Sequence, residues 1–241
     1  MELLAFQSTE THPSTAEIVA RMNVLGGSTF ATSSREQFMF CVDILRPSVA
    51  EAMEILSSSV LRPCLMDEEV ESSKLVMQYQ MEDMIPEMKL GEGLHIAAYC
   101  NQQLGRPHFA PSTSLQHLTP SEVKEFRRKH LLSSPTGMVL SGAGIEHDHL
   151  VELAERYFLS YWQSSFTSLP DQQSSYFRPS TYTGGEYRLQ ASNRMDTFTR
   201  VAMAFELGGW HSNDLVPTCV LQILLGGGSS FSAGGPGKVS V

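Results

Sequence analysis

The sequence has few cysteines, and they are too scattered to form a metal-binding or redox pair. The four stand at positions 41, 64, 100 and 219, and no two form a C-x-x-C pair. This spacing excludes a zinc knuckle and a small domain held together by disulfides. We therefore expect reduced thiols within a protein core.

Long apolar runs and an excess of basic residues are also missing. No apolar stretch approaches the roughly 20 residues that a membrane-spanning helix needs. Lys and Arg number 17 against 26 Asp and Glu, and the net charge is −9. This charge argues against nucleic acid and anionic membranes as direct partners, but it is compatible with a basic peptide. The first residues, Met1-Glu2-Leu3-Leu4, lack the basic and apolar pattern of a targeting signal.

Catalytic motifs are equally scarce. The sequence has no G-x-S-x-G elbow and no Cys/His pair that indicates a nucleophile. His147-Asp148-His149 has the residue types of a chelate. We interpret it as a helix start, where Asp148 suits capping, and we interpret the isolated histidines as structural.

The patterns that are present predict a mixture of helices and strands in one large domain. Helices are expected at 15–25, 48–60, 67–88, 91–100, 120–130, 149–162 and 214–225, and the helix at 67–88 carries a row of methionines. Strands are expected at 29–33, 37–45, 138–145, 186–190 and 197–206, and loops at 106–118 and 164–183. Because helices and strands do not alternate strictly, this order predicts an α+β sandwich, a largely antiparallel sheet covered by helices.

Local signals predict how several of these elements begin and which side they bury. Ser14 with Glu17 and Thr119 with Glu122 have the spacing of a capping box, and Asp67 is expected to cap the long helix that it begins. The methionines of that helix are expected to form a core stripe. In the strand at 37–45, the alternating apolar residues Phe38, Phe40, Val42 and Ile44 predict one buried face.

The most distinctive stretch is a glycine-rich loop at 226–237 that follows an apolar run. Glycine reaches positive φ without steric cost, so such a loop can offer backbone amides to a ligand or lie against an extended peptide. A phosphate-binding loop is excluded, because Ser232 and Val239 stand where its motif needs Gly and Ser or Thr. A flexible linker and a peptide-binding loop both remain consistent with the composition. The candidate binding residues are Gly226, Gly227, Gly228, Ser229, Ser230, Phe231, Ser232, Ala233, Gly234, Gly235, Pro236, Gly237 and Lys238.

The run GGGSSFSAGGPGK resembles, with one change, the loop GGGGSFSAGGPGK of alpha subunits of mitochondrial processing peptidases, in the peptidase M16 (insulinase-like) family. Further segments resemble the same family in the same order: LAFQST at 4–9, SSRE at 33–36, AAY at 97–99 and YTGGE at 182–186. The resemblance implies an M16-type (LuxS/MPP-like) sandwich. It also implies that residues 1–241 form most of one N-terminal domain, truncated at both ends. The first strand of that domain and the second homologous domain would then be absent.

Catalytic members of this family bind Zn²⁺ through H-x-x-E-H and a distant Glu, and the Glu within the motif acts as base on the metal-bound water. When the sequences are aligned through Leu4-Ala5-Phe6, Glu2 falls at the base position and Leu3 at the second His ligand, while the first His would precede Met1. The distant ligand falls near Gln80. The resemblance therefore implies that this chain has no catalytic residue and holds no metal, and that zinc sits in a partner subunit.

The resemblance implies a non-catalytic, substrate-recognising subunit in the mitochondrial matrix or on the matrix face of the inner membrane. It would form a heterodimer with a zinc-bearing beta subunit and bind basic presequences during protein import. Glu82, Asp83 and Glu87 are candidate acidic contacts, although a solvated helix face is the plainer interpretation of each. A structural core subunit of the respiratory bc1 complex, alone or as a second role, is the main alternative. An autonomous metallopeptidase and a truncated product without stable function are the others.

Overall fold

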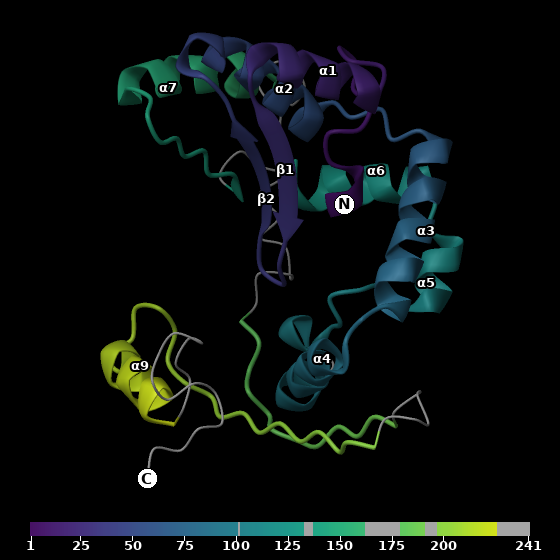
Figure 1. Cartoon of the computed structure of the whole chain (residues 1–241), viewed down its shortest axis with the longest axis vertical. Helices are drawn as coiled ribbons and strands as arrows, with labels where there is room; N and C mark the ends of the chain where they lie inside the picture. The colour runs from purple at the N-terminus through teal and green to yellow at the C-terminus, as the bar shows by residue number, and fades with distance from the viewer. Residues whose placement is uncertain (101, 133–136, 162–178, 191–196, 226–241) are drawn as a thin grey trace.

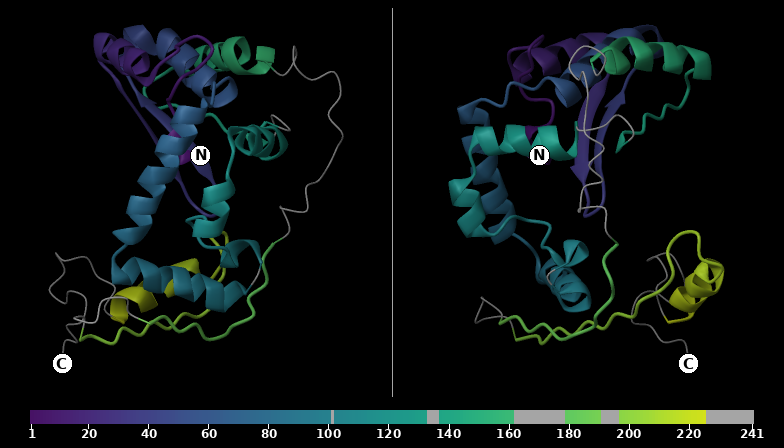
Figure 2. Two further views of the ribbon diagram at one scale, coloured as in Figure 1. Left: turned by 90° about the vertical axis from the view of Figure 1, so that its right-hand side faces the viewer. Right: turned by 180° about the vertical axis from the view of Figure 1, so that it is seen from behind.

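The computed structural model describes residues 1–100, 102–132, 137–161, 179–190 and 197–225. The candidate glycine-rich loop at 226–237 lies outside these ranges. The elements are η1 (Glu2–Leu4), α1 (Thr15–Leu25), β1 (Ser28–Ser33), β2 (Phe38–Asp43), η2 (Arg46–Ser48), α2 (Val49–Leu61), α3 (Asp67–Glu82), α4 (Pro86–Tyr99), η3 (Gln103–Gly105), α5 (Ser112–His117), α6 (Pro120–His130), α7 (His147–Ala154), the π-helical turn η5 (Glu155–Leu159) and α9 (Leu215–Leu224). Helices α1, α2 and α7 form a layer from which the β-hairpin of β1 and β2 projects. Helices α3, α5 and α4 lie to one side, and α9 lies apart (Figure 1, Figure 2).

Helix α2 lies at the centre of the packed part of the chain. On one side, Met53 and Leu61 pack with Leu153 of α7 and Phe158 of η5. On the other side, Ile55 packs in the cluster that α1 and the hairpin also contribute to. Because both faces of α2 bury apolar surface, this helix joins two small cores.

The hairpin and α1 match their sequence patterns closely. The Ser14 hydroxyl accepts a hydrogen bond from the Glu17 N–H at 3.2 Å and caps α1, and Gly26 ends the helix at φ 70°, in the left-handed region that glycine favours. Strands β1 and β2 pair antiparallel, with Ser33 opposite Phe38. Phe40 meets Phe6 edge to face, with 5.7 Å between ring centroids. The predicted inward face of the second strand is therefore confirmed.

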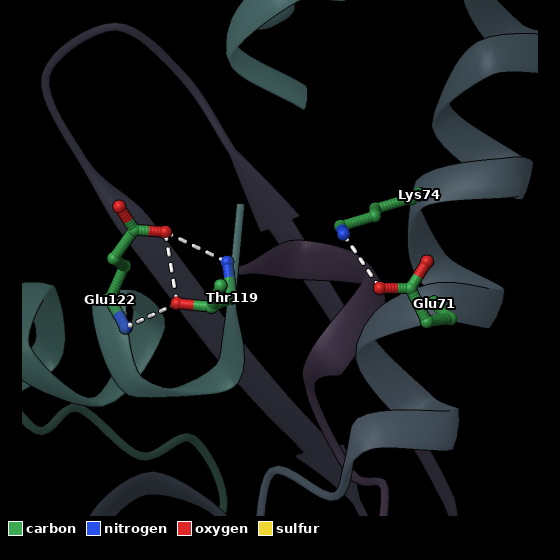
Figure 3. Close-up of polar contacts among 4 residues, drawn as sticks. All are labelled: Glu71, Lys74, Thr119 and Glu122. Atoms are coloured by element: carbon green, nitrogen blue, oxygen red, sulfur yellow. Dashed lines mark hydrogen bonds and ion pairs between the residues drawn. The ribbon is translucent and has the colours of Figure 1, made fainter. Parts of the chain in front are cut away.

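Helix α6 begins with the predicted capping box. The Glu122 carboxylate accepts hydrogen bonds from the N–H and the hydroxyl of Thr119 at 2.8 and 3.0 Å, and the Thr119 hydroxyl accepts one from the Glu122 N–H at 3.3 Å (Figure 3). These bonds satisfy donors that a helix start otherwise leaves unpaired. Pro120 takes the first helical position, where its missing N–H costs nothing.

Helix α3 begins at Asp67 as predicted, but its capping residue differs from the prediction. Asp67 does not cap it; instead Glu69 accepts hydrogen bonds from the backbone N–H groups of Ser8 and Met66 at 2.8 and 2.9 Å. The residue before the helix, Met66, has no polar side chain that could cap it, so the Glu69 carboxylate, one turn into the helix, accepts the hydrogen bond instead. The same carboxylate fastens the segment after η1 to α3.

The long methionine-bearing helix is two helices in the structure. Helix α3 ends at Glu82, and α4 begins at Pro86, because proline cannot continue a helix from the preceding turn. Met88 therefore lies on α4, where it is exposed. The interpretation of the methionines as one core stripe is wrong for Met88, and α5 occupies part of the stretch expected to be loop.

The largest difference between the structure and the sequence-based expectation concerns the sheet of the expected sandwich. Within the described ranges the sheet consists of β1 and β2 alone, so the fold is α+β with a small antiparallel sheet. Residues 138–145 form no strand; Met138, Leu140 and Ile145 instead pack on the core beside α2. Residues 186–190 and 197–206 also form no ladder. A strand requires a hydrogen-bonded neighbour as well as a suitable pattern, and these segments find none among the described residues.

Candidate functional site

Glu2 and Leu3, the residues at the aligned base and ligand positions, lie in η1 against α3. The Glu2 carboxylate accepts a hydrogen bond from the Ser33 hydroxyl at 2.6 Å. The Leu3 carbonyl accepts hydrogen bonds from the Gln7 side-chain amide at 3.2 Å and the Ser73 hydroxyl at 3.4 Å. Each of these contacts joins η1 to a neighbouring segment, so they serve packing and local geometry.

Gln80 lies on the exposed side of α3, two turns beyond Ser73. Together with Tyr79, Glu82 and Asp83 it lines an open hollow of about 530 Å³. The donor set does not fit a zinc ion, because Leu3 has no ligand atom and Gln80 offers only a neutral amide where zinc takes imidazole, thiolate or carboxylate. Within the described ranges no three His, Cys, Asp or Glu side chains gather closely enough to hold a metal ion.

The His147-Asp148-His149 segment forms the first turn of α7, as its sequence predicts. The capping position, however, belongs to Glu146, and Asp148 lies in the first turn. An acidic residue there faces the positive end of the helix dipole. The three side chains belong to no metal-binding group in the described part of the chain.

The three candidate acidic contacts fall on both sides of the break between α3 and α4. Glu82 is the last residue of α3, Asp83 follows it, and both are exposed at the open hollow. Glu87, in the first turn of α4, accepts a hydrogen bond from the Nε of Arg200 at 2.9 Å. The structure therefore brings Glu82 and Asp83 together and gives Glu87 a partner from within the chain.

Arg35 and Glu92 form an ion pair that sequence reasoning missed. Arg35 stands in the hairpin turn and Glu92 on α4, with 2.7 Å between Nη2 and Oε2. Glu92 also accepts the backbone N–H of His108 at 2.8 Å. Both charged side chains are about four-fifths covered, so this pair ties the tip of the hairpin to the α4 region.

A second missed feature is the burial of Arg127, in the last turn of α6. Arg127 is 4% exposed and donates a hydrogen bond to the carbonyl of Val60, in the last turn of α2. Burial lowers the pKa of its guanidinium to about 10, and the nearby Tyr161 acts in the opposite direction. A cation suits the carbonyl end of a helix, and Arg127 remains charged at neutral pH.

The segment containing YTGGE lies along α4. The Gln102 side chain donates to the carbonyl of Thr181 and accepts from its N–H, at 2.9 and 2.7 Å. Thr183 donates its N–H to the Ala98 carbonyl at 2.8 Å. Gly185 adopts φ 155° and lies so close to Ala97 that a side chain would meet the carbonyl of Ala97 at 2.8 Å. The AAY and YTGGE segments, far apart in sequence, are thus neighbours in the fold.

The thirteen candidate loop residues, Gly226 to Lys238, lie outside the described residues. The description ends at Leu225, directly after α9. Among the described residues no helix is long and apolar enough to cross a bilayer.

Two family models match nearly all of the chain. The insulinase (peptidase family M16) model matches residues 1–112, and the model of the peptidase M16 inactive domain matches residues 117–233. The chain is 35% identical to the probable mitochondrial-processing peptidase subunit alpha-1 of Arabidopsis thaliana and 32% identical to mitochondrial-processing peptidase subunit alpha of Homo sapiens. These alignments cover 99% of this chain but 45% and 47% of the relatives, so the chain spans about half the length of these curated relatives. The chain belongs to the peptidase M16 (insulinase) family.

Proposed function

We propose that this chain acts as a non-catalytic, substrate-recognising alpha-type subunit of a mitochondrial processing peptidase. The curated relatives are named as alpha subunits of that enzyme, and one matching family model describes an inactive domain. A subunit named alpha implies a partner, which in this proposal is a beta subunit that supplies the zinc. The proposal places the chain in the mitochondrial matrix or on the matrix face of the inner membrane, within an M16-type sandwich fold.

One observation carries the non-catalytic role. Leu3 packs in η1 with its carbonyl engaged by Gln7 and Ser73, and Gln80 offers an amide on the exposed side of α3. Neither side chain supplies the ligands that an M16 zinc ion takes. Glu2, at the base position, accepts a hydrogen bond from Ser33 instead of facing a metal-bound water.

In this proposal the loop from Gly226 to Lys238 contacts the presequence. Targeting segments for mitochondria are rich in Arg and poor in acidic residues. An acidic protein attracts such a peptide over a distance, and exposed carboxylates bind its guanidinium groups in fork-like pairs. Glu82 and Asp83 are exposed at the open hollow and are the described residues best suited to that contact.

The test deletes Gly226–Gly237 from the chain and reconstitutes it with a beta subunit. Fluorescence anisotropy measures the affinity for a labelled presequence, and product formation measures cleavage. A second variant replaces the loop by a Gly–Ser linker of equal length. If the loop binds substrate, both variants lose affinity and cleave more slowly. If it is only a linker, the second variant behaves as the wild type and the proposal fails.

The bc1 alternative is tested on the same preparation. Native electrophoresis of mitochondrial membranes shows whether the chain migrates with cytochrome bc1. The proposed role predicts migration with the beta subunit alone.

A further inference from the structure

Much of the described chain divides into two parts, and the buried apolar clusters lie in only one of them. The inner part consists of residues 1–82, 112–132 and 137–161, and the outer part of residues 86–100, 102–105 and 179–190. The clusters that contain Leu153, Leu65 and Ile18 take every member from the inner part. Among the described residues, no buried apolar cluster therefore joins the two parts.

The outer part is a unit, because the segment containing YTGGE is fastened to α4 and η3. The Gln102 side chain binds the backbone of Thr181. The Ser180 hydroxyl accepts a hydrogen bond from the N–H of Leu104, in η3, at 3.1 Å. Gly185 lies directly against the backbone of α4. This segment must therefore move with α4.

Two short segments, residues 83–85 and 106–111, connect the two parts within the described ranges. The first lies between the end of α3 at Glu82 and the start of α4 at Pro86, where proline interrupts the helical hydrogen bonds. The second runs from η3 to α5. Two bodies that share no large apolar interface are expected to move relative to each other, and short connections of this kind act as hinges.

The carboxylate of Glu92, on α4, lies where the two parts meet. The views agree in placing α4 beyond the tip of the hairpin (Figure 1, Figure 2). Oε2 of Glu92 lies 2.7 Å from Nη2 of Arg35, in the hairpin turn, and accepts a hydrogen bond from the N–H of His108 at 2.8 Å. His108 belongs to the connection at 106–111. One carboxylate oxygen therefore holds the hairpin tip and a connecting segment at the same time.

The Arg35–Glu92 pair combines a favourable and an unfavourable contribution. Both side chains are about four-fifths covered, which strengthens their attraction. However, Nε and Nη2 of Arg35 are buried without an aligned hydrogen-bond acceptor among the described residues, although Nη2 is at ion-pair distance from Glu92. A buried charge with incomplete hydrogen bonding costs free energy, and separation of the pair returns that cost. Because the two contributions oppose each other, a modest change in either shifts the balance.

We propose that the Arg35–Glu92 pair is a releasable latch, which holds the outer part against the hairpin in a closed arrangement. When the pair separates, the outer part swings about residues 83–85 and 106–111, and both charged groups gain hydration. Helix α4 and the segment containing YTGGE then move away from the hairpin as one body. This latch does not depend on the proposed function.

Double electron–electron resonance on the whole chain measures the closed and open populations. One spin label is attached to the native Cys100, which is exposed at the end of α4. The other is attached to V24C, at an exposed position of α1 in the inner part. The substitutions C41S, C64S and C219S remove the other thiols. The distance between the two labels then reports how far the outer part lies from the inner part.

A charge exchange tests the latch. R35E places a second carboxylate opposite Glu92, and we expect it to raise the ratio of long to short distances by roughly 5- to 30-fold. The double variant R35E/E92R restores opposite charges and returns most of the short-distance population. The labelled chain with the native pair supplies a measurement that needs no substitution at the latch. Raising the ionic strength from about 0.05 to about 0.5 M weakens the pair and lengthens the mean distance.

The matched control is R128E, which reverses the charge of an arginine in an exposed ion pair with Glu125 on α6. It leaves the distances unchanged. Circular dichroism of each variant shows that the fold is retained. A distance distribution that changes neither with R35E nor with ionic strength overturns the proposal. An R35E shift that the double variant does not reverse, or that R128E reproduces, also overturns it.

Discussion

The carboxylate of Glu2 accepts a hydrogen bond from the hydroxyl of Ser33 at 2.6 Å. Glu2 opens η1 and Ser33 is the last residue of β1, so the bond connects the first turn of the chain to the hairpin. In catalytic members of the family the aligned glutamate activates a metal-bound water. In this chain the same side chain is a structural acceptor.

The first prediction removes that bond. Ser33→Ala should lower the free energy of unfolding by about 1 kcal/mol, because a half-buried carboxylate loses a hydrogen-bond donor. Urea denaturation measures this loss. Ser28→Ala, on the same strand but exposed, is the control and should change little. If Glu2→Gln abolished cleavage by the reconstituted pair without altering stability, Glu2 would have a chemical role and our interpretation would be wrong.

The second prediction concerns the buried cation Arg127. Arg127→Ala should cost about 2–4 kcal/mol, because it leaves a cavity and removes the donor to the Val60 carbonyl. Arg127→Met keeps most of the volume and avoids the cost of burying a charge, so it should stay within about 1 kcal/mol of the wild type. Arg128→Ala, which breaks only an exposed ion pair with Glu125, is the control.

The pKa of Arg127 adds a pH dependence to that prediction. Burial lowers it from its ordinary value to about 10 in the folded state, so above pH 10 the unfolded chain binds more protons. The cost of burying the cation is therefore fully present below pH 10 and is relieved as the pH rises above it. Relative to Arg127→Met, the wild type should gain stability in this range. If the difference in unfolding free energy between the wild type and Arg127→Met stayed constant from pH 8 to 11, the lowered pKa of Arg127 would be contradicted.

The third prediction uses the capping box of α6. Hydrogen bonds from the backbone and then the side chain of Thr119 lower the pKa of Glu122 below its ordinary 4.5. A depressed folded-state pKa gives stability that is present above pH 4.5 and is lost as the pH falls through the folded-state value. Glu122→Gln should therefore be less stable than the wild type at pH 7, and the difference should shrink toward pH 3. Thr119→Ala, which removes the side-chain donor, should reduce the same pH dependence.

The fourth prediction breaks the tie between the hairpin and α4. Arg35→Met should cost about 1–2 kcal/mol, because it leaves the largely covered Glu92 carboxylate without its cation. Arg21→Met, which removes an exposed pair with Glu51, should cost less. Thermal unfolding measures both losses. If Arg35→Met and Arg21→Met lost the same stability, burial of the Arg35–Glu92 pair would not strengthen it.

Local signals in the sequence predicted the elements whose stabilising contacts are also local. The Ser14 cap, the Thr119–Glu122 box and the alternation of Phe38, Phe40 and Val42 each act within a few residues, and the structure confirms all three. The start of α3 at Asp67 agrees with the prediction, but its capping residue was missed because the carboxylate that caps it, Glu69, lies within the helix and also binds Ser8.

Features that depend on distant partners could not be predicted from patterns. Arg127 meets Val60 across 67 residues, and Arg35 meets Glu92 across two elements. The expected strands at 138–145 and 197–206 have suitable apolar residues, but a strand also needs a neighbour to accept its hydrogen bonds. At the candidate site, alignment identified Leu3 and Gln80 as unsuited to zinc, while the Arg200 partner of Glu87 became visible only in the fold.

The central claim is that this chain recognises substrate while a partner performs the hydrolysis. The most direct measurement is the zinc content of the purified chain by elemental analysis, together with its cleavage of a presequence with and without a beta subunit. We predict that the chain alone holds no stoichiometric zinc and cleaves nothing, and that cleavage appears when the beta subunit is added. Stoichiometric zinc and cleavage by the chain alone would contradict the account.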